Sequence, residues 1–385
     1  MKTNLNRAHR PLGALSTLFI VSAFMAGAPH KASAQQAQPA PTGSVDAGAL
    51  ARDEAAEAQA ERAPSYPRLT GGVAIELEDD YTFDSDDPMA EINDLYTTTE
   101  AALALEFSAR TSINATLVLE PIRDPGPNDD REFEDLGLYA EELYFKHDFG
   151  QAAVVAGKFD LAFGFAWDAA PGLYGTDFAE DYELTEKIGA AVEIPFMLGG
   201  GEAVFTVAAF MADRTILSDS LGSNRGDTDE SDGGVSNTDA PESFVVSLTG
   251  ETEGVTYNVA FRRQAEGAGD TDDEFGFVAG ASAPVFGESG VELLGEVAYF
   301  PNFGGASDSA VYGTLGLAAP VGPVTLSGVY SIRDVQNAST DHLATVSAEY
   351  EITAGLSVGA GYRYGHEGGD DSHTVGALLV YEFGF

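Results

Sequence analysis

The 385-residue sequence contains no cysteine and few basic residues. Without cysteine the folded chain has no disulfide bonds, and thiolate metal sites and cysteine nucleophiles are excluded. Only 19 Lys and Arg stand against 62 Asp and Glu, which gives a formal net charge of −43. A chain with this charge repels nucleic acid and anionic membrane surfaces, so we expect no nucleic-acid partner.

Long apolar runs are also missing beyond the N-terminal region. Basic residues there precede an apolar stretch from Leu12 to Gly27, and Ala32-Ser33-Ala34 follows it. This three-part pattern predicts a secretory signal peptide over residues 1–34, cleaved before Gln35. No later stretch is long and apolar enough to predict a transmembrane helix. Residues 35–65 are rich in Ala, Pro, Gln and Glu and poor in large apolar side chains, which predicts a periplasmic linker.

From Tyr66 onward, apolar residues alternate with polar or small ones. Val73, Ile75 and Leu77 show this period of two, and the pattern recurs to the C-terminus. Such a period indicates strands with one apolar face. A soluble sandwich hides that face between two sheets, whereas a membrane barrel turns it toward lipid.

The connections between these strands favour the barrel. About sixteen strands fit the sequence, and tight turns such as 198–201 and 320–323 alternate with longer loops. This asymmetry is typical of outer-membrane proteins, whose long loops lie outside the cell. We therefore predict an all-β, antiparallel transmembrane β-barrel over residues 66–385, with about 16 strands, short periplasmic turns and long acidic outer loops.

The acidic residues gather in the predicted outer loops, at 79–94, 121–136, 160–186, 213–242 and 266–274. Clustered carboxylates repel one another, so we expect divalent cations to bind weakly at many loop positions and to bridge to lipopolysaccharide.

Aromatic residues alternate at the end of the chain, where Tyr381 and Phe383 precede the terminal Phe385. This ending resembles the C-terminal assembly signal of outer-membrane barrels. It implies the barrel-assembly machinery as a partner through Phe385, and outer-membrane lipids around the folded protein.

Polar positions opposite the apolar stripe are expected to face the lumen, which a barrel of about sixteen strands leaves wide enough for water. The predicted pore-lining residues are Lys158, Lys187, Glu193, Arg262, Glu292, Glu296, Arg333 and Arg363. Acidic residues dominate the lumen and its mouth, which favours a channel that prefers cations. Alternatively, Lys158, Lys187, Arg262, Arg333 and Arg363 form a basic ladder with local affinity for anions.

One predicted loop, residues 160–185, is unusually aromatic for an exposed segment. It contains the only tryptophan of the chain. Either it folds into the lumen and narrows it, or it caps the mouth of the barrel. The residues predicted to form a constriction are Phe163, Trp167, Asp168, Tyr174, Asp177, Glu180 and Asp181.

Residues 138–194 carry a family resemblance. Glu141-Glu142-Leu143, Gly157-Lys158-Phe159, Phe163-Gly164 and the run from Asp181 to Glu186 resemble the siderophore-porin family of the LbtU type and, more distantly, phosphate-selective porins. The chain departs from that pattern at Ala162, where proline is expected. The resemblance implies a porin fold and, through it, uptake of siderophore-type solutes.

These features predict a porin-like channel for passive or facilitated uptake of small hydrophilic solutes. The alternative is a surface-exposed structural or adhesin-like barrel with a plugged lumen. A hydrolase needs His, Ser and Asn together, and the sequence places no such set at one point. Two acidic segments, His366–His373 and Asp227–Gly233, are interpreted as solvated loops. We therefore expect neither an enzyme, a cofactor nor a tight metal site.

Overall fold

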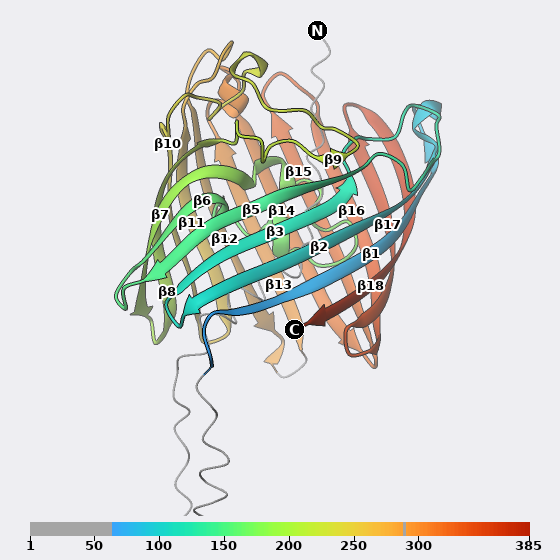
Figure 1. Cartoon of the computed structure of the whole chain (residues 1–385). Helices are drawn as coiled ribbons and strands as arrows, with labels where there is room; N and C mark the ends of the chain where they lie inside the picture. Colours follow the sequence, from blue (N-terminus) through green and yellow to red (C-terminus); the bar gives the residue numbers. More distant parts are fainter. Residues whose placement is uncertain (1–63, 288–289) are drawn as a thin grey trace, which may run out of the picture.

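The computed structural model describes residues 64–287 and 290–385, and sixteen long strands within them form one closed antiparallel barrel (Figure 1). The long strands are β1 (Arg68–Ser85), β2 (Asn93–Ser108), β3 (Thr111–Pro121), β5 (Leu136–Asp148), β6 (Ala153–Leu161), β7 (Leu184–Leu198), β8 (Gly201–Ala212), β10 (Ser243–Thr252), β11 (Val255–Gln264), β12 (Glu274–Val285), β13 (Val291–Phe300), β14 (Ala310–Val321), β15 (Val324–Val335), β16 (Thr340–Thr353), β17 (Leu356–Glu367) and β18 (Asp370–Gly384). Each pairs with its neighbours, and β18 closes the ring on β1 from Gly72↔Gly384 to Ser85↔Ser372. The predicted fold class and strand number are confirmed.

Two further strands and five helical turns lie in the connections. They are β4 (Arg131–Glu132), β9 (Leu221–Gly222), α3 (Ala166–Ala169), η1 (Pro88–Ala90), η2 (Glu180–Tyr182), η3 (Glu230–Asp232) and η5 (Phe303–Gly305). None of the helices in the described part of the chain is long and apolar enough to cross a membrane.

The alternation of side chains separates two surfaces. On β1, Ile75 and Leu77 are exposed on the outside, whereas Ala74 and Glu78 are buried inside. The same period continues around the ring, for example at Val297, which is exposed next to the buried Glu296 and Ala298. The barrel therefore has an apolar outer belt and an interior rich in polar groups, as strands of period two require.

Short turns lie at one end of the barrel and longer connections at the other, which we call the turn end and the loop end (Figure 1). Two predicted loops were too long. Asp79–Ser85 belongs to β1, and only residues 368–369 separate β17 from β18. The ladder between β1 and β18 extends to Ser85, because backbone hydrogen bonds continue where the side chains are polar. The predicted signal peptide, and all but the last two residues of the predicted linker, lie outside the described residues.

Two connections at the loop end are longer than the rest, and we call them loop 3 (residues 162–183) and loop 4 (residues 213–242). Loop 4 completes the wall beside β5. That strand pairs with β6 only from Leu143 toward the turn end, and nearer the loop end it pairs with β9 of loop 4 at Gly137↔Gly222. Loop 4 thus supplies the backbone partner that the shorter β6 leaves missing.

Candidate pore constriction

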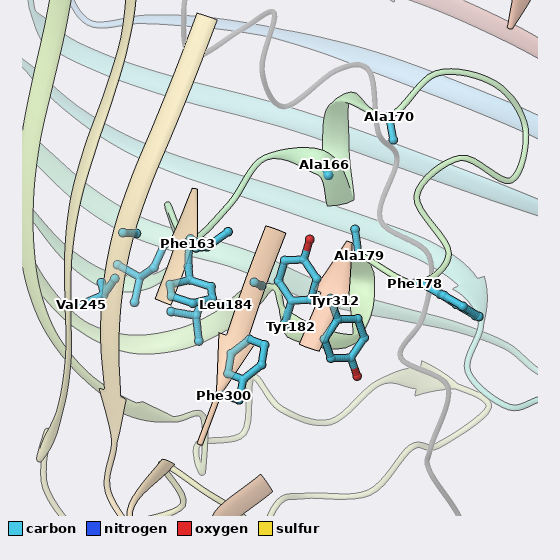
Figure 2. Close-up of a cluster of buried hydrophobic side chains, with 14 of the residues drawn as sticks. Phe163, Ala166, Ala170, Phe178, Ala179, Tyr182, Leu184, Val245, Phe300 and Tyr312 are labelled. Atoms are coloured by element: carbon cyan, nitrogen blue, oxygen red, sulfur yellow. The ribbon is translucent and has the colours of Figure 1, made fainter. Parts of the chain in front are cut away.

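Loop 3 lies inside the barrel, where its aromatic residues form a buried cluster with the wall (Figure 2). Phe163 contacts Phe300 of β13 with 5.9 Å between ring centroids, and Tyr182 contacts Tyr312 of β14 at 5.1 Å. These side chains are almost fully buried. The burial of several aromatic rings explains why a loop between two strands leaves solvent for the interior.

Glu296 of β13 holds both ends of loop 3. Its carboxylate accepts hydrogen bonds from the backbone N–H of Phe165 at 2.8 Å and of Ala166 at 3.2 Å. The hydroxyl of Tyr182, at the other end of the loop, donates to the same carboxylate at 2.7 Å. Hydrogen bonds to an ionised acceptor are stronger than neutral ones, so Glu296 serves as a central anchor.

The middle of loop 3 reaches the opposite part of the wall. The Leu173 N–H donates to Ser347 Oγ of β16 at 3.0 Å, and the Tyr174 hydroxyl donates to Asp80 of β1. Gly376 of β18 makes this approach possible, because a Cβ there would lie 2.0 Å from the Tyr174 hydroxyl. Loop 3 therefore crosses the lumen and contacts the wall from β11 to β1.

Three inward-facing arginines bind loop 3. Arg363 of β17 pairs with Asp177 at 2.8 Å, and Arg333 of β15 pairs with Asp181 at 2.7 Å. Arg262 of β11 donates to the Tyr182 carbonyl at 2.6 Å and pairs with Glu274. It also lies over the ring of Phe163, 4.4 Å from the centroid. All three predicted lumen arginines are thus engaged in ion pairs within the protein.

Two acids of loop 3 differ in their partners. Asp168 is 7% exposed, and its Oδ1 has no hydrogen-bond partner. Burial raises the pKa of Asp168 from 3.8 to about 7. Burial also raises the pKa of Asp181, and the Arg333 guanidinium partly opposes this. Asp168 is therefore an acid of loop 3 whose charge changes near neutral pH.

The wall from β1 to β6 carries acids. Glu100 of β2 lies close enough to Glu76, Glu120, Glu142 and Asp168 for the carboxylates to repel one another. Across residues 64–287 and 290–385, no three acidic or histidine side chains converge as a metal site would require. The acids therefore lie together on the part of the wall opposite the arginines that hold loop 3.

The predicted pore-lining residues occupy different surroundings. Arg262, Glu296, Arg333 and Arg363 face inward and contact loop 3. Glu193 pairs with Lys146 at 2.7 Å, and Glu292 accepts a hydrogen bond from Ser282. Lys158 is fully buried and pairs with Glu186 and Asp213. Lys187 is partly exposed. Four of the five predicted bases, all except Lys187, form ion pairs with acids of the protein.

The seven predicted constriction residues all lie on loop 3. Phe163, Tyr174, Asp177 and Asp181 contact the wall as described above. Trp167 packs against the aromatic cluster, and the Thr176 hydroxyl donates to Glu180 within the loop.

Sequence reasoning missed the role of Arg225 in loop 4. Its guanidinium lies 3.8 Å from the centroid of the Tyr139 ring and pairs with Glu186 through two nitrogens. Tyr139 in turn donates to Glu120 of the acidic wall. The sequence contains one signal for this role, because Arg214 and Arg225 are the only bases of a strongly acidic loop. In the structure both form ion pairs.

No family model matches the chain, and no curated protein matches it by sequence. Solved structures with a similar fold exist. The outer membrane channel DcaP of Acinetobacter baumannii has a TM-score of 0.56 and 13% identity, covering 82% of this chain and 96% of that one. OprB of Pseudomonas putida has a TM-score of 0.58 and 10% identity, with 82% and 94% covered.

An anion-selective porin from Comamonas acidovorans has a TM-score of 0.51 and 14% identity, covering 82% of this chain and 99% of that one. At these identities the likeness establishes a shared fold. The neighbours are outer-membrane porins, so the chain has a porin-type barrel.

Proposed function

We propose that this protein is a passive channel of a bacterial outer membrane, through which small hydrophilic solutes cross along a lumen narrowed by loop 3. One observation carries the proposal: a closed barrel, apolar outside and polar inside, holds an internal loop by charged and aromatic contacts to its wall. The membrane location rests on the apolar belt and on the porin-type fold.

The test is single-channel recording of the refolded chain, starting at Gln35, in a planar bilayer. Stepwise conductance is the expected result. Protein that is folded, as judged by heat-modifiable migration on gels, but produces no steps would overturn the channel function. Mass spectrometry of the exported protein tests the cleavage site, with Gln35 expected at its N-terminus.

A preference for cations is part of the proposal. The arginines of the lumen are paired with acids, and the connections at the loop end carry many more acids than bases. Single-sign charge raises the local concentration of counter-ions, most strongly at low salt. We expect a reversal potential of cation-selective sign that decreases as salt rises. An anion-selective sign would instead favour the alternative of a basic surface inside an acidic shell.

A plugged structural barrel is the second candidate. It is supported by the burial of Glu100 and Glu120, which are each 3% exposed although they face the interior. In this case the acidic loops at the cell surface provide the function, and the folded protein conducts no ions.

The residues that resemble the siderophore-porin family make no contacts that support uptake of siderophore-type solutes. Gly157 allows close backbone approach to Leu143, and Phe163 and Tyr182 are buried in the aromatic cluster. These residues shape the barrel and anchor loop 3. A solute class is therefore better argued from the cavity at the loop end.

A further inference from the structure

A cavity of about 560 Å³ lies at the loop end of the barrel, apart from the contacts that hold loop 3. It is formed by the residues after β3, the start of β7, the end of β8 and loop 4. Its lining consists of Ile122, Arg123, Asp124, Glu186, Lys187, Ala212, Asp213, Ser218, Arg225, Gly226 and Thr228. The volume is within the range of roughly 300–1,000 Å³ that is usual for small-molecule sites.

Most of the charged groups that line this cavity are already paired. Glu186 binds Lys158 at 2.6 Å and also pairs with Arg225. Asp213 binds Lys158 at 3.0 Å. Arg123 lies 3.7 Å from Asp135 and donates to a backbone carbonyl of loop 4. These groups form the rigid frame of the cavity.

Two charged side chains in the lining stand apart from this frame. Within residues 64–287 and 290–385, Lys187 and Asp124 make no direct ion pair and no side-chain hydrogen bond. Lys187 lies opposite Phe159 and Ala212 in the sheet, and therefore points inward. Arg262, Glu186, Glu183 and Asp160 act on Lys187 through electrostatics without a direct contact. The cavity thus offers one ammonium and one carboxylate to a ligand.

We propose that this cavity binds small zwitterions of the amino-acid class, with the ligand carboxylate on Lys187 and the ligand ammonium on Asp124. A simple anion is repelled by the acidic loops and by the net charge of −43. A simple cation leaves the Lys187 ammonium without a counter-ion. A molecule that carries both charges satisfies both side chains with charge-assisted hydrogen bonds. The inference rests on the proposed function, because it treats the cavity as a site that a solute occupies on its way into the channel.

The test uses L-glutamine as the probe and isothermal titration calorimetry of the refolded chain in detergent. Two analogues test the two charged contacts separately, because glutaramate lacks the ammonium and 4-aminobutanamide lacks the carboxylate. We expect saturable binding of glutamine and binding at least about tenfold weaker for each analogue, since each loses one charge-assisted contact.

Lys187→Gln and Asp124→Asn should each weaken glutamine binding by about tenfold or more. Matched controls are Lys146→Gln, a lumen lysine outside the cavity, and Asp129→Asn, an exposed acid of the same loop as Asp124. The controls should bind glutamine like the unaltered protein. Heat-modifiable migration verifies that each variant is folded.

Absence of glutamine binding by the folded protein overturns the inference. Binding of both analogues as tight as that of glutamine, or unchanged glutamine binding by both cavity variants, overturns it as well. Failure of the channel proposal is distinguishable. Glutamine binding without conductance would reject the channel and retain the site, whereas conductance without glutamine binding would reject the site and retain the channel.

Discussion

The guanidinium of Arg363 on β17 lies 2.8 Å from the carboxylate of Asp177 on loop 3, although 186 residues separate them in the sequence. Both side chains are mostly buried, and Arg363 also binds Glu367 at 2.6 Å. Loop 3 is therefore fixed to a strand far along the chain. The strength of this attachment determines whether the lumen has one width or several.

Replacing this arginine tests the attachment. Arg363→Gln removes the buried guanidinium that pairs with Asp177 and Glu367, so we expect the free energy of unfolding to fall by about 3 kcal/mol. Loop 3 should also become mobile, with larger and noisier single-channel conductance. Arg68→Gln is the control, because Arg68 pairs with Glu106 at an exposed position and its loss should change stability much less than the loss of Arg363. Equal effects of the two variants would contradict the role of the pair.

A methyl group on Gly376 should displace loop 3. The added Cβ would lie 2.0 Å from the Tyr174 hydroxyl and 2.5 Å from Asp80, so Gly376→Ala should destabilise the protein by about 1–3 kcal/mol through overpacking. Faster proteolysis within loop 3 is the expected readout. Gly328→Ala, whose nearest neighbour would be 3.6 Å away, should leave the cleavage rate unchanged. Tyr174→Phe in the Gly376→Ala background should slow cleavage again, and failure to do so would argue against this contact.

Asp168 should make the packing of loop 3 depend on pH. Its pKa is raised from 3.8 to about 7 in the folded protein, so the folded state binds more protons between these values. The contribution of Asp168 to stability is therefore greatest at low pH and is lost as the pH rises from about 4 to about 7. Trp167 is the only tryptophan, and its fluorescence reports the state of this loop. Asp168→Asn should remove the dependence in that window. A wild-type signal that is constant between pH 5 and pH 8 would refute this assignment.

Phe385 should be required for closure of the ring. Its backbone exchanges two hydrogen bonds with Gly71 of β1, at 3.0 and 3.2 Å. Deleting Phe385 should leave unassembled protein in the periplasm that is degraded by protease and does not migrate as a folded barrel. Phe385→Tyr keeps the aromatic ring and should assemble. Normal heat-modifiable migration of the deletion would show that the terminal residue is dispensable.

The barrel could be predicted from the sequence because its signals are local. Alternation at Val73, Ile75 and Leu77 assigns the outer face of β1, and tight turns such as 198–201 assign the pairing of neighbouring strands. The ends of the strands at the loop end could not be predicted. Asp79–Ser85 has the composition of a loop, but its backbone is paired with β18.

The sequence indicates which side chains face inward at the candidate site, but it does not indicate which residues they contact. An inward position on β15 follows from the pattern, yet nothing near Arg333 in the sequence indicates that Asp181 neutralises it. The basic ladder considered from sequence requires free arginines, whereas Arg333 and Arg363 pair with acids of loop 3 and Arg262 pairs with a strand residue. Only the folded chain shows which charged side chains are neutralised by a partner, because pairing across the lumen depends on the path of a loop.

The pairing of β9 with β5 has a consequence for engineering the protein. Leu221 and Gly222 complete the wall beside the exposed edge of β5, so loop 4 is part of the barrel at this height. An epitope tag inserted there would open a backbone edge that can pair with a neighbouring molecule.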